Sequence, residues 1–301
     1  MKIENPTVSV RTLPMNALTE TWVVFSHEAR RSARSAKTLV LLILYSLASV
    51  ISGLIFVAAS RKAQEGLATL AGGQQIPADD MVKMKMGALS LFFGKEEELL
   101  RYLADIPLVV LFFYKFALFF LPLLIALMGF DQISGELSSR SIRYVSLRAR
   151  RGSLLAGKVI AQAAVLLGLT AVMNLGVFAY AAATTENFAV GAGLAAMARF
   201  WLLALVYTST YLGLTALCSA LFRTPIVSLL TSLCALFVFW LLAMLGKFEK
   251  LAFLSWATPS HYEDGLVSLE PLQALGAAGA YVLFAAAFLG LAYLALRRRD
   301  L

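Results

Sequence analysis

Long apolar runs constrain this chain more than any other feature of its sequence. Two of them, residues 106–130 and 159–183, are each 25 residues long. About 20 apolar residues are enough for a helix to cross the hydrocarbon core of a membrane. We therefore predict an all-α integral membrane protein with six transmembrane helices, at residues 38–59, 106–130, 159–183, 198–221, 225–246 and 274–296. Only 15% of the residues are charged, against about 25% in soluble domains.

The distribution of charge over the loops predicts the orientation. If the amino terminus is cytoplasmic, 16 lysines and arginines face inward and nine outward, whereas six acidic residues face inward and 12 outward. Because basic loops stay on the cytoplasmic side, we expect both termini on the cytoplasmic side of a bacterial cytoplasmic (inner) membrane. The loop at 60–105 should then lie on the outer side. The net charge of +8 thus belongs to membrane topology, and no nucleic-acid partner is expected.

Residues 1–37 form the predicted cytoplasmic amino-terminal segment, and 38–301 the six-helix domain. Within residues 19–37, helical spacing places Trp22, Val23, Phe25 and Ala29 near one face and the arginines mostly on another. Such a pattern is typical of an amphipathic helix that lies in the membrane interface. The alternative is an extension of the first transmembrane helix.

Two residues within the second apolar run are informative. Lys115 lies 16 residues before Asp131, so we expect its ammonium group close enough to the outer surface to snorkel there. A functional intramembrane charge is the alternative. Pro122 should free a backbone carbonyl and kink the helix, because proline has no N–H.

Hydroxyl side chains cluster in the fourth and fifth apolar runs. Helix packing or a subunit seam explains them, because small polar residues let membrane helices approach and hydrogen-bond. The alternative is a mildly polar translocation surface. The candidate residues for this path or dimer seam are Tyr207, Thr208, Thr210, Tyr211 and Thr231.

Candidate metal and catalytic residues are sparse. Met81, Met84 and Met86 could offer thioethers to Cu(I), but we expect them to pack within an amphipathic helix. His261 has no companion at ligand spacing, so we expect it neither to bind a metal nor to take part in catalysis. GSLLAGKV resembles a phosphate-binding loop but ends in Val159, which has no hydroxyl for Mg²⁺. We predict a chain without catalytic residues, cofactor or metal.

The basic loop at residues 131–158 carries the one family resemblance. MGFDQISGE at its start and LLAGK at its end resemble the permease subunit of type-2 ABC (ATP-binding cassette) exporters. The gliding-motility and nitrous-oxide-reductase-maturation permeases are the most similar groups. Asp131, Gly135, Glu136, Gly157 and Lys158 match the family motif. The family's Gly-Thr-Leu turn is replaced by Ser-Ile-Arg at 141–143.

This resemblance implies a complex. A cytoplasmic ABC ATPase, in two copies, would bind ATP and drive export through a permease homodimer, with a periplasmic accessory protein as a further partner. The amphipathic segment would be the family's connecting helix, and the basic loop would hold its coupling helix. The implied ATPase-coupling residues are Asp131, Gly135, Glu136, Arg140, Arg143, Arg148 and Lys158.

The loop's own residues suit coupling. Glu136 and Arg140 stand four residues apart, the spacing of a helical ion pair that would stiffen the loop. The arginines could instead only enforce orientation and bind anionic lipid headgroups.

Two other functions stay open. An ABC-type complex could do mechanical or assembly work on a periplasmic partner without moving cargo. The chain could also be a channel or membrane enzyme that needs no ATPase, although no catalytic motif supports an enzyme.

Overall fold

The computed structural model describes residues 16–70, 83, 85–87, 89–90, 93, 96–142, 149–184 and 189–299. The regular elements in these ranges are all helices. Six of the helices are long and apolar enough to cross a membrane, which confirms the predicted number. They are α2 (Ala36–Leu70), α5 (Leu108–Gly129), α8 (Arg151–Thr184), α9 (Val190–Leu221), α10 (Pro225–Leu245) and α12 (Pro271–Arg297).

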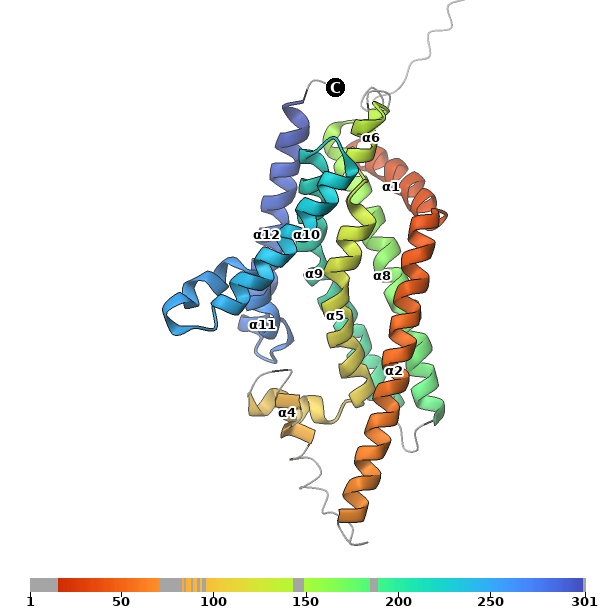
Figure 1. The fold of residues 1–301 in the computed structure, drawn as a ribbon, viewed down its shortest axis with the longest axis vertical. Coiled ribbons are helices and arrows are strands. Elements are labelled where there is room, and N and C mark those ends of the chain that lie inside the picture. Colours follow the sequence, from red (N-terminus) through yellow and green to blue (C-terminus); the bar gives the residue numbers. More distant parts are fainter. Residues whose placement is uncertain are drawn as a thin grey trace, which may run out of the picture.

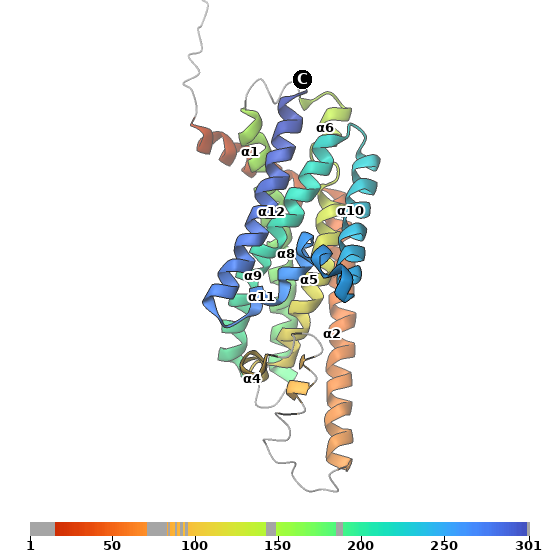
Figure 2. The same ribbon diagram turned by 90° about the vertical axis from the view of Figure 1, so that its left-hand side faces the viewer.

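These six helices run side by side in an elongated bundle (Figures 1 and 2). One end carries α1 (Ala17–Ala33), α6 (Ser134–Ser138) and the C-terminal end of α12, and we call it the α1–α6 end. The opposite end carries α4 (Glu97–Ala104). The connection between α10 and α12 contains η1 (Glu249–Ala257), η2 (Pro259–Tyr262) and α11 (Glu263–Val267). The chain therefore starts and finishes its six crossings at the same end.

The amphipathic segment forms a helix of its own. α1 ends at Ala33 and α2 begins at Ala36, and α1 leaves the bundle at an angle to α2 (Figure 1). The alternative of one helix continuing into the first span is therefore wrong. Trp22 and Val23 are exposed, and the Trp22 ring lies 5.0 Å from that of Phe25.

Several helix ends differ from the predicted ones. α8 begins at Arg151, eight residues before the predicted start of the third span, so the last part of the basic loop is helical. This extension lies against α1, where the Ser153 hydroxyl donates to the Ala17 carbonyl at 3.3 Å. Packing of this kind stabilises helical residues that are too polar to belong to a membrane span. α2 and α9 are likewise longer than predicted.

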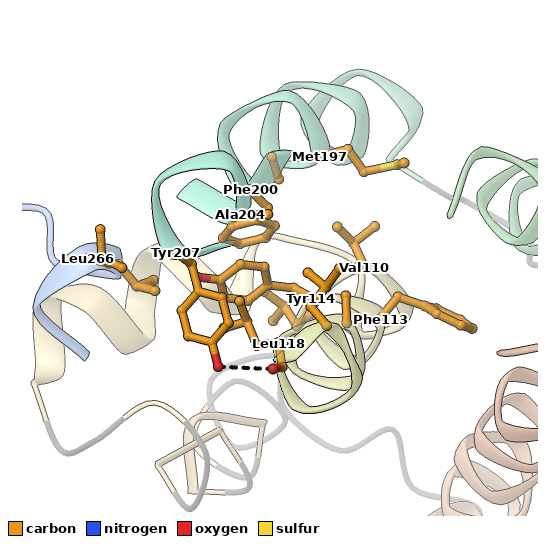
Figure 3. Close-up of a cluster of buried hydrophobic side chains, with 14 of the residues drawn as sticks. Val110, Phe113, Tyr114, Leu118, Met197, Phe200, Ala204, Tyr207 and Leu266 are labelled. Atoms are coloured by element: carbon orange, nitrogen blue, oxygen red, sulfur yellow. Dashed lines mark hydrogen bonds between the residues drawn. The ribbon is translucent and has the colours of Figure 1, made fainter. Parts of the chain in front are cut away.

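Pro122 lies inside α5, the most buried of the spanning helices. A proline leaves the carbonyl four residues earlier without its helical donor. That carbonyl belongs to Leu118, and the Tyr207 hydroxyl of α9 donates to it at 3.0 Å (Figure 3). The freed carbonyl predicted from the sequence thus has a partner on a neighbouring helix.

Lys115 does not reach toward a lipid surface as expected. Its Nζ lies 2.6 Å from Glu263 Oε1 on α11 and 4.9 Å from the centre of the Phe93 ring. Both charged side chains are largely buried. The Lys115 ammonium group therefore pairs with a carboxylate 148 residues later in the chain and does not extend to the membrane surface.

Candidate functional site

Lys158 is the centre of a buried cluster at the α1–α6 end. Its side chain is 1% exposed, and its Nζ lies 2.7 Å from Glu28 Oε1 on α1 and 2.7 Å from Glu136 Oε1 on α6. The Arg31 guanidinium lies 3.8 Å from each of the same two oxygens. The amphipathic helix α1 and two helices that carry residues of the family motif, α6 and α8, thus meet at one ammonium group.

The charges in this cluster balance. Two carboxylates face one buried ammonium group, and the second negative charge is balanced by the Arg31 guanidinium, whose side chain is 63% exposed at the edge of the cluster. A charge taken out of water is tolerated when it is paired and hydrogen-bonded, whereas removal of one partner leaves an uncompensated charge. The cluster therefore ties α1, α6 and α8 to one another.

Ser219 on α9 holds the beginning of α6. Its buried hydroxyl oxygen accepts hydrogen bonds from the backbone N–H groups of Ile133 (2.9 Å) and Ser134 (3.0 Å). The same hydroxyl donates to the Phe130 carbonyl at 3.0 Å. The first N–H groups of a helix have no partner within it, so this one side chain anchors the α5–α6 connection to the bundle.

Asp131 lies at the start of the basic loop and pairs with Lys37, the second residue of α2. The Lys37 ammonium also donates to the Met128 carbonyl at 2.8 Å and lies 4.6 Å from the centre of the Phe130 ring. Asp131 is therefore tied to α2, whereas Glu136 is tied to α1 and α8. The two acidic residues of the motif thus fasten the loop to different helices.

The two glycines of the motif differ in how closely other atoms surround them. A Cβ at Gly157 would lie 2.7 Å from the Val24 side chain and 2.9 Å from the Thr21 carbonyl oxygen, so α1 crosses α8 at a point that only glycine permits. At Gly135 the nearest atom, the Asp131 Cβ, would be at an ordinary 3.6 Å. Close packing therefore explains Gly157 but not Gly135.

Arg140 is not where helical spacing predicted it. α6 ends at Ser138, and Arg140 is exposed with a φ of 58°, the left-handed region that non-glycine residues seldom adopt. The predicted Glu136–Arg140 pair is therefore wrong, since Glu136 pairs with Lys158 and Arg31. Arg143 and Arg148 lie outside the described residues.

Sequence reasoning missed several members of the site, namely Glu28, Arg31, Lys37 and Ser219. Glu28 was detectable in part, because it is a lone acidic residue within the basic stretch HEARRSAR of the amphipathic helix. Ser219 gave no signal, since a serine in an apolar run is ordinary in membrane helices.

The hydroxyl residues of α9 are buried within the protomer. Tyr207 donates to Leu118 on α5, and the Thr210 hydroxyl donates to the Tyr281 carbonyl of α12 at 2.9 Å. Thr208 is buried, and the Tyr211 ring lies 5.0 Å from that of Tyr207. Thr231 on α10 is half-buried and donates to its own helix at Val227. Their role in a path or seam stays a prediction.

The candidate metal residues are only partly described. His261 Nδ1 lies 3.2 Å from the Ser255 hydroxyl. Among the described residues there is no group of three or more His, Cys, Asp or Glu side chains that could hold a metal ion. Met86 is described, and Met81 and Met84 lie outside the described residues.

Comparison with known proteins agrees with this architecture. The family model described as "ABC-2 family transporter protein" matches residues 22–301. A search of curated proteins finds no match. The matched region contains all six spanning helices, α6 and most of α1, including the whole Glu28–Glu136–Lys158 cluster. The chain therefore belongs to the ABC-2 family of transporter proteins, as a multi-pass membrane permease of an ABC transporter.

Proposed function

We propose that this chain is a non-catalytic permease subunit that couples ATP hydrolysis in a separate cytoplasmic ATPase to export of a substrate. Its family implies association with an ATPase subunit. The observation that carries the proposal is the buried cluster of Glu28, Glu136 and Lys158, which joins α1, α6 and α8 into one unit. Such a unit can pass a force from a bound motor into the spanning helices.

The force enters at the exposed tip of the α1–α6 end in this proposal. Ser138, the last residue of α6, is exposed there, as are Ser139 and Arg140 directly after it. The left-handed backbone of Arg140 supports a contact role, since residues held in sparsely populated conformations cluster at functional sites. Displacement of this tip would tilt α5 through its short connection to α6, and α8 through Lys158.

The α1–α6 end faces the cytoplasm of a bacterial inner membrane in this proposal, and the permease works as a homodimer with two ATPase copies. The excess of Lys and Arg in the loops at that end supports the orientation. Exposed apolar side chains along α10, among them Ile226, Phe237 and Trp240, supply a surface for a second copy beside Thr231. The hydroxyl residues of α9 are buried inside the bundle, so Thr231 is the one of the five candidate residues that would border this surface.

Charge reversal at the tip tests the ATPase partnership. An affinity-tagged chain purified from its native membranes should retain a nucleotide-hydrolysing subunit. Arg140→Glu should reduce the amount of that subunit, because it inverts a charge at the proposed contact. Arg101→Glu is the matched control, since Arg101 is exposed on α4 at the opposite end. Equal loss in both variants, or in neither, would contradict the proposed contact surface.

A second experiment tests transmission without knowing the cargo. In a background without Cys218 and Cys234, Phe253→Cys places a thiol in the exposed part of η1. Its rate of alkylation in the purified complex should change when ATP and vanadate are added. Lys158→Met should abolish that change while the ATPase remains bound. An alkylation rate that is the same with and without nucleotide would favour the alternative of a channel that needs no ATPase. Accumulation of cargo in vesicles would separate export from purely mechanical work.

A further inference from the structure

A cavity of about 500 Å³ lies between α5, α8 and α9, away from the coupling cluster. It occupies the half of the bundle nearer the opposite end, beside residues 109–118 at the beginning of α5. Figure 3 shows two of its walls, with Val110 and Tyr114 of α5 opposite Met197 and Phe200 of α9. Ligand pockets in proteins typically measure about 300–1,000 Å³.

The cavity is apolar, and the unpaired polar atoms of the residues around it are covered by protein. None of the described residues that line it carries a charge. Three of them have a buried polar atom that makes no hydrogen bond within the described part of the chain: Tyr114 Oη, Asn174 Oδ1 and Trp201 Nε1. Tyr114 is 4% exposed, and its ring stacks on Phe200 at 4.2 Å. These three atoms are covered by neighbouring protein atoms and offer no hydrogen bond to an occupant, so the wall of the cavity is apolar.

The chemistry of the lining identifies the class of occupant. A hydrocarbon chain suits an apolar wall, whereas a charged headgroup would lack a countercharge among the lining residues. The cavity also lies within spanning helices, and it reaches the outer surface of the bundle at Leu202 and Leu205, which are 67% and 49% exposed. Lipid has access there.

We propose that this cavity is a lipid-binding site, which holds an acyl chain of a membrane glycerolipid. The chain enters between the helices from the surrounding bilayer. The site is separate from the coupling cluster, and its occupancy does not depend on an ATPase.

Gly168 allows the cavity to be filled from one position. It lines the cavity, and a Cβ built there meets no atom within 4 Å. Gly168→Phe should therefore occupy the space without displacing a helix. Gly176 on the same helix also has nothing within 4 Å of its Cβ but does not line the cavity, so Gly176→Phe is the matched control. Ala198→Phe, from α9, fills the same cavity if the first variant does not fold.

Trp201 supplies the readout. A variant with Trp201 as its one tryptophan (Trp22→Phe, Trp240→Phe, Trp256→Phe) is reconstituted in phosphatidylcholine vesicles whose acyl chains are brominated, because bromine quenches indole fluorescence on contact. We expect strong quenching of Trp201, loss of that quenching in Gly168→Phe, and no change in Gly176→Phe. A variant that keeps only Trp240, which is 59% exposed, reports the surrounding lipid and should be quenched regardless of Gly168.

Three results would overturn the proposal. Quenching of Trp201 that persists in folded Gly168→Phe and Ala198→Phe would show contact with surrounding lipid only. Absence of quenching in brominated vesicles would mean that the cavity holds water or nothing. In detergent micelles, quenching by a brominated free fatty acid but not by brominated phosphatidylcholine would exclude the ester-linked source.

Discussion

Lys158 shows how much one side chain contributes to the organisation of this permease. An ammonium group that is 1% exposed is stable only while its two carboxylate partners remain beside it. The hydrogen bonds are short, and the partners come from residues 130 and 22 positions earlier in the chain. Its surroundings are therefore a product of tertiary structure alone.

Lys158→Met is expected to lower the free energy of unfolding by about 3–5 kcal/mol, because Glu28 and Glu136 would then share a buried site without their central cation. Unfolding in mixed micelles of detergent and SDS measures the change. Replacing both carboxylates by Gln in the same variant should recover part of the loss. Arg101→Met, which breaks an exposed pair with Glu97, is the control and should have little effect. An equal effect of the two variants would refute the buried cluster.

Ser219→Ala tests the attachment of α6. The variant would leave two buried backbone N–H groups without an acceptor, so we expect a loss of about 1–3 kcal/mol in the free energy of unfolding. Faster amide exchange at Ile133 and Ser134 should accompany it. Ser209→Ala removes a hydroxyl that bonds only within its own helix and should be close to neutral. Unchanged exchange in Ser219→Ala would contradict the described role.

At the scale of helices, α1 and α8 cross where Gly157 allows backbone and side chain to touch. Gly157→Ala should separate the two helices and cost about 1–3 kcal/mol, as overpacking does. Val24→Ala in the same chain should restore only a small part, because it removes the Val24 Cγ1 but leaves the Cβ of residue 24 and the Thr21 carbonyl oxygen in the way. Gly176→Ala, on an open face of α8, should be neutral or mildly stabilising. Thermal unfolding midpoints of the purified variants give the comparison, and a neutral Gly157→Ala would contradict the close crossing.

α5 and α9 are joined through the carbonyl that Pro122 frees. Tyr207→Phe should destabilise the fold by about 1–3 kcal/mol, because the Leu118 carbonyl would be unpaired in an apolar environment. With Pro122→Ala already present, the helix can supply its own donor to that carbonyl, and Tyr207→Phe should then cost much less. The double-mutant cycle measures this difference directly. Equal costs in both backgrounds would mean that the hydroxyl acts elsewhere.

At the scale of the whole molecule, the orientation of the bundle is open to a direct test. In a background without Cys218 and Cys234, we expect a membrane-impermeant maleimide to label Phe253→Cys from outside intact cells. Ser139→Cys, at the exposed tip of the α1–α6 end, should react only after permeabilisation. This outcome follows from the excess of basic residues around that end. The reverse pattern would place the coupling site outside and exclude a cytoplasmic motor.

The spanning helices could be predicted from sequence because their signal is local. A run of more than 20 apolar residues has one low-energy arrangement in a membrane, whatever its neighbours are. Helix ends were predicted less well, as at Arg151, because packing against α1 decides where α8 begins. The snorkelling predicted for Lys115 and the partner predicted for Glu136 were wrong for the same reason, since spacing along one helix says nothing of a carboxylate or ammonium group elsewhere in the chain.

The sequence by itself determined that this chain is a six-helix membrane protein with an amphipathic helix before its first span and the motif of an ABC-2 permease. Hydropathy and a motif confined to residues 131–158 carry that information, because both depend on short stretches of the chain. Only the tertiary structure decided which charges meet at Lys158, which glycine is required for packing, and where an apolar cavity lies. Burial makes these contacts strong, and burial depends on residues that are far apart in the sequence.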